Sequence, residues 1–444
     1  MKIKKKPLSI YIHIPFCKKK CLYCDFLSAP ACGQERESYV KALLHEISFM
    51  AEKASEYEVI SVFFGGGTPS LLNRSQMNRI MSAIRKGYCL AQDCEITIEC
   101  NPATADYDKL AFFKACGINR LSIGLQSAND KELKELGRIH NYKQFLATFE
   151  AARKAGFTNI NIDIMSALPG QTFESYTDTL QKVISLNPEH ISAYSLIIEE
   201  GTPFYERYGE QGHSEDTAEC RMLHVPSEAV NEAAQSMNCA PIYPALPNED
   251  IERKMYHRTK SVLQKAGYER YEISNYAKKG YECRHNLTYW TGVDYLGVGI
   301  GAASYFEGYR FKNCVDIGKY QECFSGKSNF LLYADKRSAD ICELDLETVL
   351  HSSRRIFHGL HEEIQLLTME EQMEEFMFLG LRLKRGISTY EFEQHFGRSL
   401  ESVYEKVIDR FIKEKLILKK DDRIYLSRRG MDVANYVMSE FLLK

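Results

Sequence analysis

Short β-branched segments alternate with helical segments along residues 9–198 of this 444-residue chain, and this alternation limits the possible folds more than any other feature. The expected strands are residues 9–14, 59–64, 95–99, 120–125, 159–164 and 190–198. The expected helices between them are residues 35–53, 75–85, 107–115, 142–155 and 175–185. A strand–helix–strand repeat of this kind predicts right-handed βαβ units and therefore a parallel sheet. The repeat alone allows either a partial barrel or an open doubly wound sheet.

The composition excludes several classes of protein. Hydrophobic residues make up 44% of the chain and charged residues 26%, which is typical of globular proteins and not of disordered or fibrous ones. The formal net charge of −3 supplies no basic field, so we expect no nucleic-acid partner. No apolar run reaches the roughly 18 residues of a membrane span. His13 and Pro15 interrupt the apolar stretch after the basic N-terminus, so we expect no signal peptide and a cytoplasmic protein.

Three of the 14 cysteines lie close together in the pattern Cys17-x3-Cys21-x2-Cys24, whereas the others are scattered. Three thiolates can hold three irons of a [4Fe–4S] cluster and leave the fourth iron open to a small ligand. An amino acid with free amine and carboxylate groups is such a ligand. Two alternatives remain on spacing alone: a zinc site with Cys32 as the nearby fourth ligand, or cysteines that bind no metal.

Glycine and polar residues follow the predicted strands. Gly66, Gly67 and Thr68 come after the second strand, and Glu99 ends the third. The carboxyl ends of parallel strands meet at one edge, which is the ligand-binding side of parallel α/β folds. In such a position, glycine backbone can approach a ligand's amine or carboxylate closely.

Charged side chains extend this set. Glu99 and Asp163 suit ribose hydroxyls or an ammonium group, and Arg138 suits a carboxylate. Taken singly, each has an ordinary alternative role as a solvated surface charge. Together they predict a pocket for an amino acid joined to a nucleoside.

The second half of the chain is less regular. The spacing of cysteine, methionine and histidine residues within 212–247 matches no standard metal site, so we expect an insertion without chemistry. No long helix follows Gly297, Gly299 and Gly301, so these glycines predict a close backbone approach and not a dinucleotide site. Residues 336–444 show the order helix, helix, helix and hairpin, which resembles a winged helix. Because both charge signs are mixed there, a packing module is favoured over a DNA-binding one.

Three motifs together resemble the radical S-adenosylmethionine (SAM) superfamily. They are Tyr11-Ile-His-Ile-Pro-Phe-Cys17-x3-Cys21-x-Tyr-Cys24, the Gly-Gly-Gly-Thr-Pro run at residues 65–69, and Glu99-Cys-Asn-Pro102. Within the superfamily the chain is similar to the branch of the oxygen-independent coproporphyrinogen III dehydrogenases, and specifically to HemW-type heme chaperones. The likeness covers residues 8–210 and 248–440, including Leu168-Pro-Gly-Gln171, Tyr271-Glu-Ile-Ser-Asn-Tyr276 and His285-Asn-x2-Tyr-Trp290.

This resemblance implies an architecture and a set of binding residues. It implies a partial (β/α)6 barrel over residues 1–211, a barrel-associated segment over 248–335 and a C-terminal winged-helix-like domain over 336–444. Cys17, Cys21 and Cys24 would bind the [4Fe–4S] cluster. SAM would be bound by Tyr11, Gly66, Gly67, Thr68, Glu99, Gln126, Arg138 and Asp163. An electron from the cluster would cleave SAM to methionine and a deoxyadenosyl radical.

One departure from the motif separates two functions. Coproporphyrinogen dehydrogenases carry a further cysteine two positions after the third, where this chain has Phe26. This departure favours a heme chaperone, which binds heme and passes it to heme-requiring proteins such as respiratory enzymes at the cytoplasmic face of the membrane. The alternative is a coproporphyrinogen dehydrogenase or another radical SAM oxidoreductase acting on a porphyrin. Enzymatic activity therefore stays open at this point.

The resemblance places heme near His285, since neutral imidazole is a common axial ligand of heme iron. Cys283 offers a thiolate alternative, and Tyr289 and Trp290 offer aromatic faces to the porphyrin. The ordinary alternative is that His285 only forms hydrogen bonds within a loop and that Trp290 only packs in the core.

Overall fold

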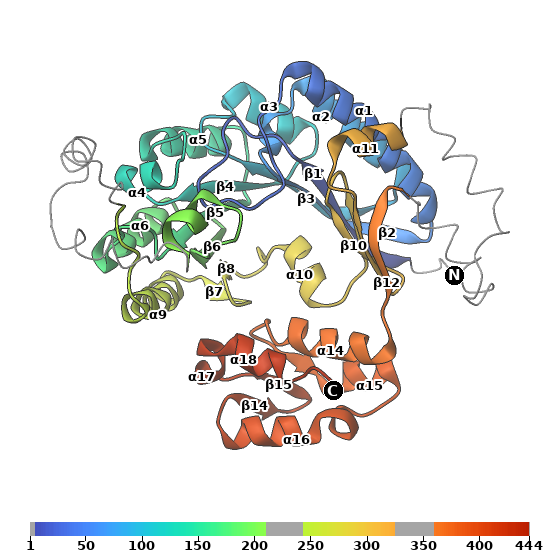
Figure 1. Cartoon of the computed structure of the whole chain (residues 1–444), viewed down its shortest axis with the longest axis vertical. Helices are drawn as coiled ribbons and strands as arrows, with labels where there is room; N and C mark the ends of the chain where they lie inside the picture. The colour runs from blue at the N-terminus through green and yellow to red at the C-terminus, as the bar shows by residue number, and fades with distance from the viewer. Residues whose placement is uncertain (1–4, 210–242, 325–358, 444) are drawn as a thin grey trace.

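The computed structural model describes residues 5–209, 243–324 and 359–443 of the chain. Most of the segment 212–247, in which we expected an insertion, lies outside these described residues. The described residues form a curved sheet with helices along its outer side, and a smaller C-terminal domain beneath it (Figure 1).

Six parallel strands lie side by side in chain order at the centre of the large sheet. They are β1 (Lys6–Ile14), β2 (Tyr57–Gly66), β3 (Leu90–Cys100), β4 (Arg120–Gln126), β5 (Ile160–Ser166) and β6 (His190–Ser195). The connecting helices are α1 (Gly33–Lys53), α2 (Arg74–Gly87), α3 (Tyr107–Ala115), α4 (Asp130–Glu135), α5 (Tyr142–Lys154) and α6 (Phe173–Ser185), with a short 3-10 turn η1 (Pro69–Leu71). This arrangement confirms the predicted partial (β/α)6 barrel, and it removes the open doubly wound sheet as an alternative.

Alternation along the strands explains the two faces of the barrel. In β1, Ile10 and Ile12 are fully buried in the main hydrophobic core beneath the helices. The alternate residues Ser9, Tyr11 and His13 point to the opposite, concave side, because successive side chains of a strand alternate. The inner face of the barrel is therefore polar and aromatic, and this is where ligand chemistry can be placed.

Additional strands extend the sheet at both edges. Beyond β1 come β9 (Tyr295–Val298), β10 (Ala303–Phe306), β11 (Tyr309–Asn313) and β12 (His361–Leu366); beyond β6 come β8 (Asn275–Ala277) and β7 (Glu269–Arg270). Helices α7 (Pro203–Tyr208), α9 (Glu249–Lys265), α10 (Arg284–Trp290) and α11 (Ile317–Cys323) complete this part. Because β12 pairs with β11 in the large sheet, residues 361–366 belong to the barrel and not to the C-terminal domain that we predicted from residue 336.

The glycines after β9 have the expected packing role. A Cβ atom at Gly297 would collide with the backbone of Ala302 and Ala303, and one at Gly299 with the hydroxyl of Tyr39. Gly299 also has a φ of +101°, a conformation that side chains disfavour. The tight turn from β9 to β10 therefore depends on glycine for space.

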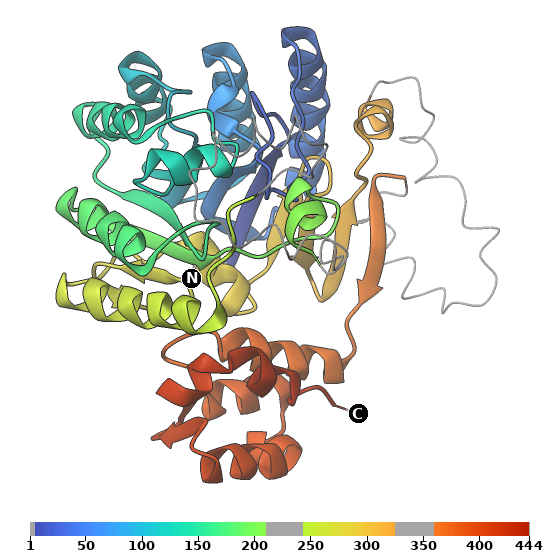
Figure 2. The ribbon, with the colours of Figure 1, turned by 60° about the vertical axis from the view of Figure 1, so that its left-hand side comes forward.

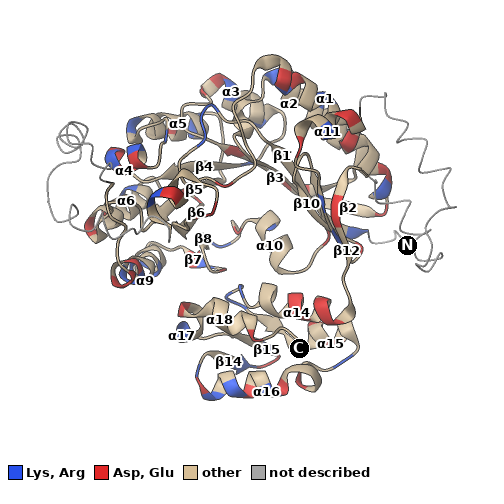
Figure 3. Cartoon of the chain, in the orientation of Figure 1, with Lys and Arg blue, Asp and Glu red and all other residues tan. Residues whose placement is uncertain are grey.

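The C-terminal domain has its own small hydrophobic core. It consists of α14 (Met369–Gly380), β13 (Ile387–Ser388), α15 (Thr389–Phe396), α16 (Leu400–Lys413), β14 (Ile417–Lys420), β15 (Arg423–Leu426), α17 (Arg428–Asp432) and α18 (Ala434–Ser439). The order of helices and hairpin is the one predicted, with β13 added to make a three-stranded sheet. Its charged residues are of both signs: among the acidic and basic residues, α14 carries only acidic ones, whereas α16 carries both (Figure 3).

Helix α10 lies between the barrel and the C-terminal domain (Figures 1 and 2). On the domain side, the guanidinium of Arg382 sits 4.2 Å from the ring centroid of Trp290. The same guanidinium lies 3.7 Å from a carboxylate oxygen of Glu272, which is only 1% exposed. Arg382 therefore links the C-terminal domain to both α10 and the β7–β8 connection. Among the described residues, no helix combines the length and apolar character needed to cross a membrane.

We expect Arg382→Ala to lower the free energy of unfolding by about 2 kcal/mol, because the buried carboxylate of Glu272 loses its counter-charge and Trp290 loses a cation–π partner. Urea unfolding followed by the emission of Trp290 measures this change. Lys384→Ala is the matched control, since the Lys384–Glu269 pair is exposed at both ends and should change stability by less than about 0.5 kcal/mol. Equal losses in the two variants would contradict the assigned role of Arg382.

Candidate functional site

The loop with the three cysteines crosses the carboxyl edge of the strands between β1 and α1. Cys17 N–H donates to the carbonyl of Ala29 (3.1 Å), and Leu22 N–H donates to the carbonyl of Leu136 (3.1 Å). Phe204 N–H in turn donates to the carbonyl of Leu22 (3.1 Å), so backbone bonds to α7 and to the end of α4 fix the loop. Cys17, Cys21 and Cys24 are all free thiols and all partly exposed.

A chain of polar contacts joins Cys17 to Cys21 along the carboxyl edge of the sheet. Thr68 Oγ1 lies 3.5 Å from Cys17 Sγ and accepts a hydrogen bond from Asn101 Nδ2 (2.7 Å). Arg138 Nη2 donates to Asn101 Oδ1 (2.7 Å), and Arg138 Nη1 donates to Cys21 Sγ (3.6 Å). Asn101 was missing from the predicted site residues, although it stands in the quoted Glu99-Cys-Asn-Pro102 motif. Its role follows only from its contacts with Thr68 and Arg138 in the folded chain.

The donor set fits an iron–sulfur cluster better than a single zinc ion. Burial raises the pKa of Cys24 to about 11, and the neighbouring thiols of Cys21 and Cys17 add to this shift. Cys32, the fourth ligand of the zinc alternative, is exposed at the N-cap of α1, where its N–H donates to Glu35. Three grouped thiols without a fourth match a cubane with one open iron.

The glycine-rich loop after β2 packs directly against β1 and the cysteine loop. Gly66 has a φ of +106°, and a Cβ atom there would lie 2.5 Å from the ring of His13. A Cβ atom at Gly67 would lie 2.8 Å from the backbone of Phe16, next to the first cysteine. Thr68 N–H donates to the carbonyl of Phe16 (2.7 Å). Because these two positions have no room for a side chain, glycine allows the loop after β2 to lie directly against β1 and the start of the cysteine loop.

Two buried carboxylates belong to neighbouring parts of the same sheet: Glu99 lies near the end of β3, and Asp163 lies within β5, with β4 between the two strands. Burial, and to a lesser extent repulsion from Asp163, raise the pKa of Glu99 to about 8, although a hydrogen bond from Gly66 N–H (3.2 Å) opposes the shift. Burial also raises the pKa of Asp163, whose oxygens accept from Asn161 Nδ2 (2.8 Å) and Ser122 Oγ (3.1 Å). Two desolvated carboxylates that repel each other favour a ligand with hydroxyl or cationic groups.

Tyr11 and Gln126 complete the predicted SAM residues at this edge. His13 Nε2 lies 2.9 Å from the carbonyl of Leu27, which can only accept, so His13 Nδ1 accepts from Tyr11 OH (3.1 Å). Gln126 has a φ of +72°, a strained conformation for a residue with a side chain. Arg138 Nε is buried without a hydrogen-bond partner in the described part of the chain, which suits an anionic group arriving from outside.

The predicted heme residues lie on α10 or, for Cys283, at its N-cap, and this helix packs against β2. His285 is 1% exposed, and both of its ring nitrogens are engaged, Nδ1 with Ser61 Oγ and Nε2 with Tyr289 OH, each at 2.9 Å. Its ring stacks on Phe63 with a centroid distance of 5.0 Å. This structure therefore leaves no free nitrogen of His285 for iron, so ligation requires one of these bonds to open.

Cys283 is a weaker candidate ligand in this structure. It is fully buried, its Sγ donates to Glu95 Oε1 (3.5 Å), and burial raises its pKa to about 12, so the thiol holds its proton. Glu95 also accepts from the backbone N–H groups of Arg284 (3.2 Å) and His285 (3.3 Å). A carboxylate of β3 thus caps a helix that has no side-chain cap of its own.

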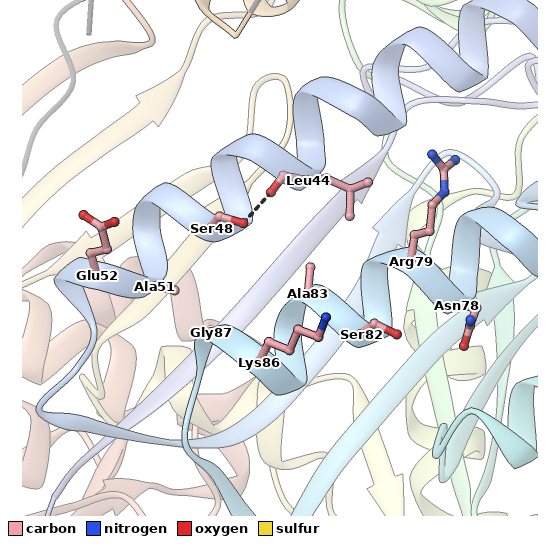
Figure 4. A pocket seen from close by; sticks show the side chains of 10 residues that line it. All are labelled: Leu44, Ser48, Ala51, Glu52, Asn78, Arg79, Ser82, Ala83, Lys86 and Gly87. Atoms are coloured by element: carbon pink, nitrogen blue, oxygen red, sulfur yellow. Dashed lines mark hydrogen bonds between the residues drawn. The ribbon is translucent and has the colours of Figure 1, made fainter. Parts of the chain in front are cut away.

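A hollow of about 590 Å³ lies elsewhere, between α1 and α2 on the outer side of the barrel (Figure 4). Leu44, Ala51 and Ala83 form part of its wall, and Arg79 and Lys86 stand at its border. None of the predicted site residues lines it. The hollow therefore has no part in the chemistry considered above.

Two family models match the chain. The model of the radical SAM superfamily matches residues 11–183, and the model of the HemN C-terminal domain matches residues 367–433. The first range runs from β1 into α6, before β6 begins, and the second covers most of the C-terminal domain.

Several proteins are similar along most of the chain. The heme chaperone HemW of Lactococcus lactis is 34% identical over 99% of this chain and 98% of its own length, and that of Bacillus subtilis is 34% identical over 98% and 99%. The mitochondrial radical S-adenosyl methionine domain-containing protein 1 of Mus musculus is 31% identical over 87% of this chain and 75% of its own. The solved structure of the coproporphyrinogen III oxidase HemN from Escherichia coli shares the fold, with a TM-score of 0.71 at 22% identity over 99% of this chain and 90% of that one.

Alanine in place of Cys17, Cys21 or Cys24 is expected to abolish the visible absorption of the cluster and the binding of about four irons per chain. The reason is that a cubane with one open iron has no spare protein ligand. Iron analysis after anaerobic reconstitution measures the effect. Cys32→Ala is the control, since this thiol sits at a helix cap, and loss of iron in that variant would rule out the three-ligand model.

Glu99→Gln is expected to change stability and ligand binding in opposite directions. The folded-state pKa of about 8 lies above the ordinary value of 4.5, so the wild-type protein loses stability as the pH rises between these values. The neutral variant escapes this loss and should be more stable by roughly 1–2 kcal/mol at pH 8.5 and unchanged at pH 4. At pH 8.5, where the wild-type carboxylate is charged, affinity for SAM should fall roughly tenfold or more, because the charged acceptor is lost.

Thermal unfolding at several pH values and titration calorimetry with SAM provide the two readouts. Glu58→Gln, at the exposed start of β2, is the control for the loss of one carboxylate. A variant with wild-type affinity for SAM would remove Glu99 from the pocket.

Proposed function

Because the chain belongs to the HemW family of heme chaperones within the radical SAM superfamily, we propose that it binds heme and delivers it to heme-requiring proteins. The observation that carries this proposal is the match to HemW chaperones over nearly the whole chain, at 34% identity. A family relation of this extent implies a [4Fe–4S] cluster and SAM as its cofactors.

Three grouped thiols are the proposed anchor of the cluster. Cys17, Cys21 and Cys24 would hold three irons, and Arg138 and Asn101 would keep the first two cysteines at a fixed separation through Thr68. When bound, the cluster supplies an electron and an open iron for the amine and carboxylate of SAM.

The remaining residues of the proposed pocket would bind SAM and fix its orientation. Glu99 and Asp163 offer acceptors for ribose hydroxyls or the ammonium group, and Arg138 offers its unpartnered Nε to an anionic group. Tyr11, Gln126 and the loop Gly66-Gly67-Thr68 form the rest of the pocket. The two raised carboxyl pKa values support binding of a polar, partly cationic ligand at this edge.

Heme is proposed to bind at α10, with His285 as the iron ligand. Burial and the nearby charge of Arg120 lower the pKa of His285 to about 3, which keeps the imidazole neutral, as ligation requires. Tyr289 and Trp290 are partly exposed on the same helix and would contact the porphyrin. Heme ligation at this position needs the bond between His285 Nε2 and Tyr289 OH to open.

The residue two positions after Cys24 favours the chaperone over a coproporphyrinogen dehydrogenase. Phe26 occupies the position of the further cysteine in those enzymes, and it is 58% exposed in this chain. The similarity to the Escherichia coli oxidase concerns the fold alone. We place the protein in the cytoplasm, with its heme acceptors at the cytoplasmic face of the membrane.

The anaerobically reconstituted protein should bind added heme with a Soret band distinct from free heme and release it to an apo-cytochrome, because the family function is transfer. The same protein incubated with coproporphyrinogen III, SAM and a reductant should form no protoporphyrinogen. His285→Ala is expected to lose the distinct Soret band and keep the cluster. Formation of protoporphyrinogen would overturn the proposal, as would failure of the wild-type protein to bind heme.

A further inference from the structure

A row of buried hydroxyl groups runs from β1 and β2 into α10 and ends on the proposed heme ligand. Thr288 Oγ1 lies 2.7 Å from Ser9 Oγ, and Ser9 Oγ lies 2.6 Å from Ser61 Oγ. Ser61 Oγ lies 2.9 Å from His285 Nδ1. All four side chains are at most 2% exposed, so water does not interrupt the row.

From this row we propose that Tyr289 is a removable cap on the ligand nitrogen of His285, and that the Thr288–Ser9–Ser61 hydroxyls hold that nitrogen in its metal-binding form. The inference rests on the proposed function, because it assumes that heme binds at His285. It adds a resting state to that site and names the residues that maintain it.

The proton positions follow from counting donors. Thr288 Oγ1 donates its single proton to the carbonyl of Arg284 (3.1 Å), since a carbonyl can only accept. Ser9 must then donate to Thr288, and Ser61 must donate to Ser9. Ser61 has no proton left for His285 and accepts from Nδ1–H. The hydroxyl row therefore fixes the tautomer in which Nε2 carries a lone pair.

An iron ion would bind through this lone pair of Nε2, and in this structure the Tyr289 hydroxyl is hydrogen-bonded to it. With Nδ1 protonated in the neutral ring, Nε2 can only accept, so Tyr289 OH donates to it at 2.9 Å. Tyr289 is one helical turn after His285 and packs edge-on against Tyr295 with a centroid distance of 4.7 Å. The tyrosine is partly exposed whereas the histidine is buried, so movement of Tyr289 is the shortest way to open Nε2 to a ligand.

The first test removes the cap and keeps its ring. Tyr289→Phe retains the contact with Tyr295 but has no hydroxyl to compete with iron, so heme affinity should rise roughly three- to tenfold. Equilibrium titration of the Soret band of the full-length protein with hemin measures the change. Tyr295→Phe is the matched control, because the Tyr295 hydroxyl bonds Arg310 Nη1 (3.0 Å) and does not touch His285. Unchanged or weaker binding in Tyr289→Phe overturns the cap.

The second test breaks the hydroxyl row at a position remote from heme. In Ser9→Ala, the Ser61 hydroxyl loses its acceptor and is free to donate to Nδ1, which moves the imidazole proton to Nε2 and removes the lone pair. Heme affinity should fall at least roughly fivefold, and the iron–imidazole stretching band in resonance Raman spectra of the ferrous complex should weaken. Wild-type affinity and spectrum in Ser9→Ala overturn the tautomer assignment.

Hemin binding by His285→Ala separates failure of this inference from failure of the proposed function. If His285→Ala binds hemin like the wild-type protein, the heme site is elsewhere and the proposed function loses its site. If His285→Ala loses heme while Tyr289→Phe and Ser9→Ala behave like wild type, only the inference fails. Cluster absorption and SAM binding of each variant confirm that the barrel is folded.

Discussion

The guanidinium of Arg138 connects the cysteine loop to the ends of the parallel strands, and the geometry of the carboxyl edge depends on it. Its Nη2 donates to the carbonyl of Gly124 at the end of β4 (2.6 Å) and to Asn101 after β3 (2.7 Å). Its Nη1 reaches Cys21 Sγ. A planar group with five donors in a fixed arrangement can bind two strands and a loop at once, which a lysine could not do. The ends of β3 and β4 and the Cys21 thiol are thereby tied to one side chain.

The opposite end of the barrel is organised by a second buried charge. Glu95 of β3 accepts three hydrogen bonds from the first turn of α10 and sits near the buried Arg120 of β4. The helix is short and has no cap of its own, so its place is determined by the sheet and not by its local sequence. Tyr11 also stacks over His285 at a centroid distance of 6.3 Å. The proposed SAM and heme sites are thus two ends of one lumen and share an aromatic wall.

Sequence patterns predicted the parts of the structure that arise from local order. Each of the six parallel strands was expected at its observed position because β-branched runs and helical spacing are local signals. The grouping of Glu99 and Asp163 followed from the rule that ligands bind at the carboxyl edge of parallel strands. Asn101, Ser61 and Glu95 were not predicted as site residues, because their partners are distant in sequence and only the fold brings them together. The burial of His285 was missed for the same reason, since nothing in residues 283–290 reveals what β2 places against them.

The position of β1 in the sheet has a consequence for the synthesis of the chain. Strand β1 leaves the ribosome before the other described strands, yet it is an interior strand, paired with β2 on one side and with β9 on the other. Its Ser9–Ile12 edge finds its partner Tyr295–Val298 only after all the residues between them have been made. The nascent barrel therefore carries an open strand edge until β9 has been made, and such edges pair readily with other chains. A fragment that ends after β6 would keep that exposed edge permanently, even though it contains every residue of the proposed cluster and SAM sites.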